Sequence, residues 1–142
     1  MNKVVSFLTL YTVIFLIEII FIFIGLILFD SSKIDFFNIR RAWLGSAQWG
    51  FWRVLFYGLP FIVLYFLLFK YLGNIKLFKP LLFSLFNLLV YVSLSVLSRV
   101  IWGKNVPLPP DGIMCWITCI SIILSPLLLG QIPYFKKLME SL

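Results

Sequence analysis

Histidine is absent from the 142 residues of this chain, and only five acidic residues accompany its twelve lysines and arginines. The commonest general base and zinc ligand is therefore missing, which argues against most hydrolytic and metal-dependent chemistry. Cysteine is scarce as well, since only Cys115 and Cys119 occur, four residues apart inside one apolar segment. That spacing cannot link distant parts of a fold, so we expect two inert buried thiols. We expect no metal site, no cofactor and no enzymatic activity.

Charge is the next shortage, because charged residues make up only 12% of the chain while 63% is hydrophobic and 19% aromatic. Soluble domains contain about twice that share of charged residues, so the composition indicates a membrane protein with a single domain. The net charge of +7 does not indicate nucleic-acid binding. Lysine and arginine lie between the apolar segments, where anionic lipid head groups and the orientation of membrane helices account for them.

Four long apolar segments predict four transmembrane helices and an all-α integral membrane protein. The first segment is too long for the apolar region of a signal peptide, so we expect it to be retained. An even number of spans places both termini on the same side of the membrane. The predicted spans cover about residues 4–29, 52–69, 80–100 and 113–132.

Two prolines interrupt the predicted spans. Pro60 lacks the N–H that would bond to the carbonyl of Phe56, and Pro126 lies near the end of the fourth span. Because proline removes one hydrogen bond of the helix and its ring crowds the preceding turn, we expect a kink at each position.

The segment between the first two spans is more polar, yet its apolar residues, including Ile39 and Trp43, recur at helical steps. This pattern predicts a short amphipathic helix over about residues 33–45 that lies on the membrane surface. Arg40, Arg41 and Trp43 would then contact lipid head groups or dock a protein partner.

The third span carries a polar stripe, in which five polar residues recur at steps of three or four and so share one helix face. Because unpaired polar groups are costly in lipid, we expect this stripe to face other helices or a hydrated path. Small polar residues are also the usual packing surface of membrane helices. The stripe consists of Ser84, Asn87, Tyr91, Ser95 and Ser98.

Glu18 is the sharpest candidate site, because it is an acid near the centre of the first span, where a charge costs about 3 kcal/mol or more. We find no lysine or arginine at the same depth in any predicted span. Glu18 would therefore be protonated, hydrogen-bonded to neutral groups or hydrated. Counted from the span starts, Asn87 and Tyr91 lie at a similar depth and are the expected partners. The pair would form a packing hydrogen bond, a titrating transport site or a pore-facing carboxylate.

In outline the chain resembles the small multidrug-resistance transporters, which are short, have four spans and carry one glutamate in the middle of the first span. That glutamate binds protons and cationic drugs in turn, so the resemblance implies a proton-coupled transporter of hydrophobic cations that uses Glu18. The residues after Glu18 are Ile-Ile-Phe-Ile-Phe-Ile-Gly, whereas the family has a small residue and threonine there and a lysine at the span end. Colicin-immunity proteins, some holins and membrane subunits of bacterial phage-defence operons share the size and span number.

The leading hypothesis is a non-enzymatic protein of a bacterial inner membrane that acts as a homo-oligomer or as the membrane subunit of a larger complex, with pore formation among its roles. The bilayer, further copies and a protein at the loops are the expected partners, and a Glu18-dependent transporter is the alternative. Lysines and arginines divide six to six between the two sides. Three lysines in the loop between the second and third spans favour cytoplasmic termini.

Overall fold

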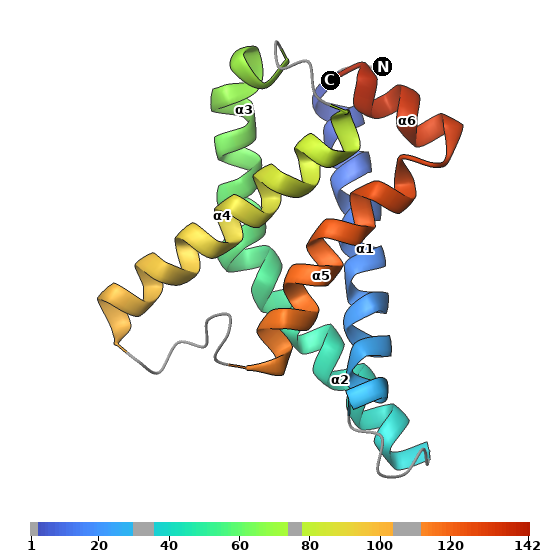
Figure 1. The fold of residues 1–142 in the computed structure, drawn as a ribbon, viewed down its shortest axis with the longest axis vertical. Helices are drawn as coiled ribbons and strands as arrows, with labels where there is room; N and C mark the ends of the chain where they lie inside the picture. Colours follow the sequence, from blue (N-terminus) through green and yellow to red (C-terminus); the bar gives the residue numbers. More distant parts are fainter. Residues whose placement is uncertain (1–2, 30–35, 74–77, 104–111) are drawn as a thin grey trace.

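The computed structural model describes residues 3–29, 36–73, 78–103 and 112–142, and within these ranges the chain is helical apart from short turns. No strand occurs in the described ranges, so the all-α prediction is confirmed (Figure 1). The elements are α1 (Lys3–Phe29), α2 (Phe36–Arg53), the π-helix η1 (Val54–Gly58), α3 (Leu59–Gly73), α4 (Lys79–Trp102), α5 (Ile113–Leu129) and α6 (Pro133–Glu140).

Three of these helical stretches are long and apolar enough to cross a membrane: Lys3–Phe29, Ile39–Leu68 and Lys79–Ile101. The helices α5 and α6 meet the same test only as a pair, and the pair is bent by 101°. The chain therefore has three candidate membrane-spanning helices by length and composition, or four if the bent pair counts as one span.

The second span differs from its prediction, because the helix that leads into it begins much earlier. Helix α2 starts at Phe36 and continues through η1 into α3, so Ile39–Leu68 is one candidate span of 30 residues. The separate surface helix predicted over residues 33–45 is not found in the described part of that segment, and residues 33–35 lie outside it. The cause is packing: Gly50 has no side chain, so α2 can lie directly against Ile19 of α1.

The structure accommodates Pro60 with a π-helix. Because Pro60 has no N–H, the carbonyl of Phe56 loses its usual helical donor. In the turn just before the proline the backbone widens, and the N–H of Leu59 bonds to the carbonyl of Val54, five residues back. Single π-helical turns of this kind are common at functional sites. Here η1 follows directly after Arg53 and joins α2 to α3. It therefore sets the direction of α3 relative to α2.

The second predicted kink lies a turn later than Pro126. Helix α5 contains Pro126 and continues to Leu129, and the N–H of Gly130 donates to the carbonyl of Pro126 at 2.9 Å. The chain then turns into α6, which crosses the end of the bundle (Figure 1). Its inner face buries Leu138 and Met139 in the core.

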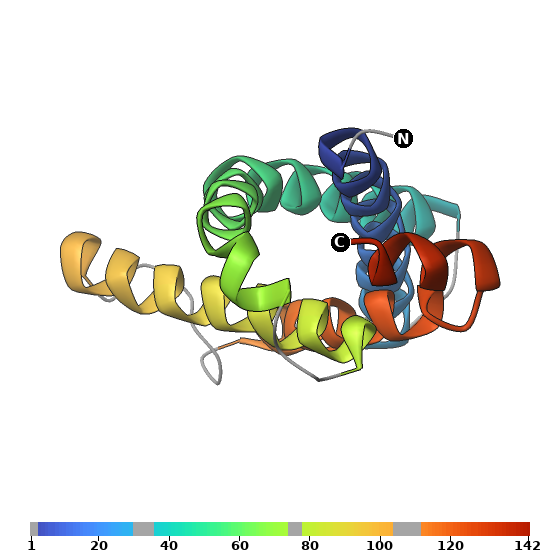
Figure 2. The same cartoon turned by 90° about the horizontal axis from the view of Figure 1, so that it is seen from above.

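The helices run alternately between two ends of the molecule, and both chain termini lie at the same end, where α3 finishes and α4 begins (Figure 1). Stacked aromatic rings hold that end together. The ring centroids of Phe7 and Tyr65 are 4.4 Å apart, and those of Tyr65 and Phe83 are 5.1 Å apart. Figure 2 shows that the C-terminal half of α4 extends away from the other helices.

The close approach of α1 and α2 predicts different outcomes for two glycines of α2. Alanine is better than glycine inside a helix by about 1 kcal/mol. At Gly45 the new methyl group would find its nearest neighbour, Leu26 Cδ1, at 3.9 Å, so Gly45→Ala should be neutral or stabilising. At Gly50 it would lie 2.7 Å from Ile19 Cγ1, and overpacking of this kind costs about 1–3 kcal/mol.

We therefore expect the melting temperature of the purified Gly50→Ala protein in detergent to be lower than that of the matched Gly45→Ala protein. Equal melting temperatures for the two variants would contradict the close α1–α2 contact.

Candidate functional site

Glu18 of α1 and Arg53 of α2 form a buried ion pair. Arg53 Nη2 lies 3.0 Å from Glu18 Oε2 and donates to Glu18 Oε1 at 3.1 Å. The two residues expose only 1% and 2% of their surface. A buried charge is costly to leave alone, so each residue constrains the position of the other.

Asn87 of α4 completes the pair by contacting both charged groups. Its Nδ2 donates to Glu18 Oε1 at 3.2 Å, and its Oδ1 accepts from Arg53 Nη2 at 3.4 Å. An amide can serve both partners because it carries a donor and an acceptor. The expected hydrogen bond between Glu18 and Asn87 is present, and the cluster links α1, α2 and α4.

The prediction that no cation lies at the depth of Glu18 is wrong. It placed Arg53 at the membrane surface, because the second span was expected to begin near Trp52. Since the candidate span is Ile39–Leu68, Arg53 lies near its middle. A signal for this position was present in the sequence: Arg41, Gly45, Trp49 and Arg53 recur every four residues and so share a helix face.

The polar stripe of α4 faces the other helices. Four of its members, Ser84, Asn87, Tyr91 and Ser95, are buried, and Ser98 is half-buried. Ser84 Oγ donates to the Ile123 carbonyl of α5 at 2.9 Å, and Ser95 Oγ donates to Tyr57 Oη of η1 at 3.4 Å.

Tyr91, the second expected partner of Glu18, packs beside Arg53 instead. The guanidinium carbon of Arg53 lies 5.9 Å from the centroid of the Tyr91 ring, within the range of a cation–π contact. The ring of Tyr57 packs against that of Tyr91, with centroids 4.9 Å apart. The cation of the pair is therefore held by the carboxylate, by an amide and by an aromatic ring.

Tyr11 and Gly58 lie at the edge of this cluster. The Tyr11 side chain is 7% exposed, and its hydroxyl lies close enough to Arg53 for the two groups to interact electrostatically. The same hydroxyl packs against Gly58, and the Cβ of any other residue at position 58 would collide with it. Among the described residues, four buried side-chain atoms have no hydrogen-bond partner: Tyr11 Oη, Glu18 Oε2 and the Nε and Nη1 atoms of Arg53.

A second polar contact links α2 to α5, one helical turn before Arg53. Trp49 Nε1 of α2 donates to Thr118 Oγ1 of α5 at 2.9 Å, and Thr118 Oγ1 donates to the Met114 carbonyl at 2.7 Å. A hydroxyl buried in a helix commonly bonds to the carbonyl four residues earlier, which leaves its lone pairs free to accept. Trp49 and Thr118 therefore tie α2 to α5.

Beyond that contact, a cavity of about 370 Å³ lies between the ends of three helices. It is lined by Leu26 of α1, by Arg41, Ala42 and Gly45 of α2, and by Met114 of α5. Arg41, one of the residues predicted to contact lipid or a partner, thus lines this cavity.

The other two residues of that prediction lie on the same helix. Arg40 is exposed on α2. Trp43 is half-exposed and packs edge-on against Phe23 of α1, with centroids 5.4 Å apart.

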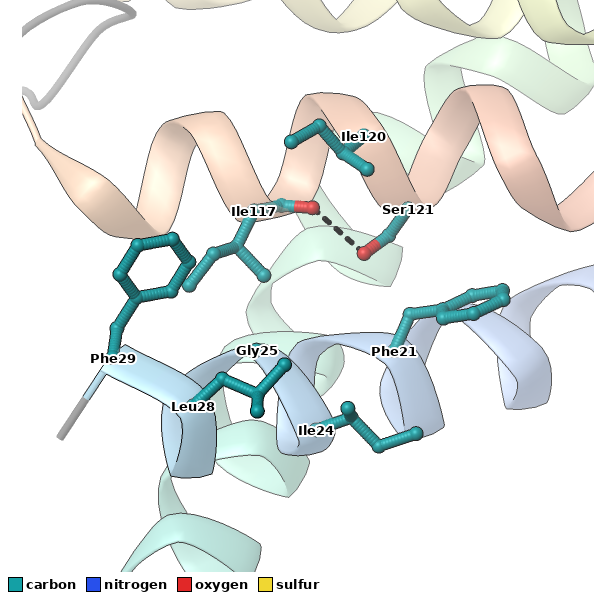
Figure 3. A pocket seen from close by; sticks show the side chains of 8 residues that line it. All are labelled: Phe21, Ile24, Gly25, Leu28, Phe29, Ile117, Ile120 and Ser121. Carbon is teal, nitrogen blue, oxygen red and sulfur yellow. Dashed lines mark hydrogen bonds between the residues drawn. The ribbon is translucent and has the colours of Figure 1, made fainter. Parts of the chain in front are cut away.

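An apolar groove of about 200 Å³ is lined by residues of α1 and α5, two helices that pack against each other (Figure 3). Gly25 lies against Ile117 beside it, and Ser121 Oγ donates to the Ile117 carbonyl at 2.7 Å. The serine hydroxyl is satisfied by its own helix, so it offers little polar recognition to a ligand in this groove.

Metal-binding geometry does not occur in the ranges that the structure describes, where no three histidine, cysteine, aspartate or glutamate side chains come together. Cys115 and Cys119 are both buried on α5 as reduced thiols. Comparisons of the chain with protein-family models, with curated proteins and with solved structures found no match. Its candidate site is therefore defined by geometry alone: an ion pair bridged by an amide, in which atoms of Glu18, Arg53 and Tyr11 have no hydrogen-bond partner among the described residues.

The buried pair predicts a strong and reciprocal dependence of stability on Glu18 and Arg53. Arg53→Met leaves the carboxylate of Glu18 without its cation, which should lower the free energy of unfolding by about 3–5 kcal/mol. Adding Glu18→Gln removes the stranded charge while keeping a hydrogen bond to Asn87, so the double variant should recover most of that loss. Denaturant titrations in a mild detergent would measure both effects.

Arg40→Met provides the control, because Arg40 is an exposed arginine of the same helix and its loss should cost less than about 0.5 kcal/mol. The ion pair would not be a stabilising element if the Arg53 and Arg40 variants were equally stable.

Proposed function

We propose that the protein is a polytopic integral membrane protein that works without catalysis, as a homo-oligomer or as the membrane subunit of a larger complex. The distribution of its side chains carries this proposal, because large apolar side chains are exposed along every long helix while Glu18, Arg53, Asn87 and several serines are buried. In water such a surface would aggregate, whereas a bilayer solvates it. The candidate spans α1, α2–η1–α3, α4 and the bent pair α5–α6 provide the membrane-embedded segments.

In this proposal the cluster of Glu18, Arg53 and Asn87 is a structural clamp between three spans. A carboxylate that already has a cation and an amide as partners is a poorer site for a hydrophobic cation than a free carboxylate would be. This arrangement favours the packing role of Glu18 over the transporter alternative. It also agrees with polar residues serving as interhelical contacts in membrane proteins.

The C-terminal half of α4 supports an assembly of several chains. Figure 2 shows it apart from the other helices, and its large side chains Val96, Leu97, Val100 and Ile101 are exposed. Helix packing in membranes depends on close contact between helices, and this stretch makes little of it within one chain. Its contact with a second copy or with a partner helix would complete the packing.

We also propose that the termini lie in the cytoplasm of a bacterial cell, with the protein in the inner membrane. Arg53 no longer counts as a loop cation, because it is buried beside Glu18. The sequence then places six lysines on the side of the termini and five lysines or arginines on the other side. The side with more cations tends to remain cytoplasmic.

The membrane proposal predicts sidedness that cysteine labelling can read. With Cys115 and Cys119 replaced by serine, Arg40→Cys should react with an impermeant maleimide in intact spheroplasts. Ser141→Cys should react only after lysis, because the start of α2 and the C-terminus lie at opposite ends of the bundle (Figure 1). Labelling of both positions in intact spheroplasts, or release of the protein from membranes by alkaline carbonate, would contradict the proposal.

Glu18→Gln separates the clamp from the transporter alternative. Glutamine keeps an acceptor and a donor for Arg53 and Asn87, so a clamp should keep the native mass of the assembly within error. Glu18→Leu offers no hydrogen bond and should lower that mass or the yield of the assembly. Native mass spectrometry from detergent would measure both variants against the wild-type protein.

Dye efflux driven by a proton gradient provides the matching functional measurement. Efflux by the wild-type protein that disappears in Glu18→Gln, with the native mass unchanged, would establish the transporter alternative in place of the clamp.

A further inference from the structure

Helix α6 is a short amphipathic helix whose inner face is fixed by the core. Leu138 and Met139 are buried and belong to the same core cluster as Phe7 of α1 and Phe83 of α4. A helix that buries one face in this way cannot rotate about its axis without exposing that face. The opposite face of α6 therefore points away from the bundle.

The turn that leads into α6 is fixed as well. Gly130 packs directly against Pro80 near the start of α4, and the Cβ of any other residue at position 130 would collide with Pro80. Lys79 is the neighbour of Pro80 in the chain, and Lys3 lies one helical turn before Phe7. The two helix starts that hold α6 thus bring further lysines to the same end of the molecule.

The outward face of α6, with the turn before it, combines apolar, aromatic and basic side chains. Ile132 is 47% exposed and Tyr134 is 60% exposed, and Lys136 and Lys137 are exposed beside them. Within the described part of the chain, neither lysine forms an ion pair. Figure 2 shows α6 along the outer edge of the bundle. This combination at an edge is typical of a helix at a membrane–water interface.

The bend between α5 and α6 gives α6 an orientation suited to such an interface. Helix α5 has 17 residues, which reach about 25 Å and so can nearly cross the hydrocarbon layer without α6. Helix α6 turns from it by 101°. If α5 crosses the membrane, α6 therefore runs almost parallel to its surface, at the end of the bundle where both termini lie (Figure 1).

Charge favours one kind of surface at this end. The sequence places six lysines and one acid, Glu140, on the side of the termini, against five cations and three acids on the other side. The cytoplasmic leaflet of a membrane carries anionic phospholipids, which attract lysines and arginines that lie close to it. The terminal end is therefore the better complement to an anionic lipid surface.

We propose that α6 lies at the membrane interface, where Lys136 and Lys137 bind the phosphate groups of anionic phospholipids. Tyr134 and Ile132 lie at the boundary between head groups and acyl chains. Helix α5 is then the fourth crossing, and α6 is an anchor on the surface. This inference rests on the proposed membrane location and adds a lipid class as the partner of α6.

The test is the melting temperature of the purified full chain in a neutral detergent, titrated with short-chain phosphatidylglycerol or phosphatidylcholine. Phosphatidylglycerol should raise it in a saturable way, since a ligand that binds the folded state stabilises it, and zwitterionic phosphatidylcholine should not. Lys136→Gln combined with Lys137→Gln should weaken the affinity for phosphatidylglycerol about tenfold. Both lysines are exposed, so the melting temperature without lipid should stay unchanged.

Two matched variants separate a site on α6 from general attraction. Arg40→Gln combined with Arg41→Gln removes the same charge from exposed residues of α2, at the opposite end of the bundle (Figure 1). It should change the affinity for phosphatidylglycerol less than about twofold, because charges beyond a Debye length are screened. Lys136→Arg combined with Lys137→Arg keeps both charges and should bind as the wild-type protein does. Equal losses in the α2 and α6 glutamine variants, or a loss in the arginine variant, would overturn the proposal.

Inorganic phosphate at the same ionic strength distinguishes a lipid from a soluble anion. It should not stabilise the protein, because only a lipid is held beside α6 by its acyl chains. Stabilisation by phosphate equal to that by phosphatidylglycerol would assign the lysines to a soluble anion, and an equal effect of phosphatidylcholine would remove the preference for anionic lipid. Either result would overturn the proposal.

This inference and the membrane proposal can fail separately. Protein that keeps its membrane sidedness but shows no preference for phosphatidylglycerol would refute the lipid contact of α6 alone. Loss of sidedness, or release by alkaline carbonate, would refute the membrane proposal, whatever the response to lipid.

Discussion

The contact between Glu18 and Arg53 is the interaction on which the arrangement of the helices depends. Two opposite charges at 3.0 Å in an apolar surrounding can be removed together, but neither can be left alone without a large cost. Arg53 must therefore reach α1, and Asn87 brings α4 to the same point. Three candidate spans thus share one fixed contact, made by Glu18, Arg53 and Asn87.

The irregular backbone after Arg53 serves this contact. Pro60 cannot donate a hydrogen bond, and the backbone before it forms the π-helical turn η1 directly after Arg53. Gly58, at the end of that turn, leaves room for the Tyr11 hydroxyl, and Tyr57, within it, packs on Tyr91. The change in helical hydrogen bonding at η1 therefore positions the Tyr57 ring and leaves room for the Tyr11 hydroxyl near Arg53.

The ion pair also changes how Glu18, the acid of the first candidate span, is interpreted. The first-span glutamate of the small multidrug-resistance transporters binds protons and cationic drugs, whereas Glu18 has a resident arginine. Among the described residues, the unused hydrogen-bonding capacity of the cluster belongs to Glu18 Oε2, Tyr11 Oη and the Nε and Nη1 atoms of Arg53. A buried acid in a chain of similar outline can therefore form a contact between helices instead of remaining open to a cation.

The sequence by itself determined the features that depend on composition and on short-range periodicity. The apolar runs predicted the helices, the polar steps in α4 predicted a stripe that the structure buries, and equal depth predicted the bond between Glu18 and Asn87. The tertiary structure alone decided where the second long helix begins. A polar stretch before Trp52 looks like a surface segment until Gly50 is seen against Ile19, where α2 packs on α1 and the helix continues. That packing places Arg53 beside Glu18, and a depth counted from the wrong helix start could not find it.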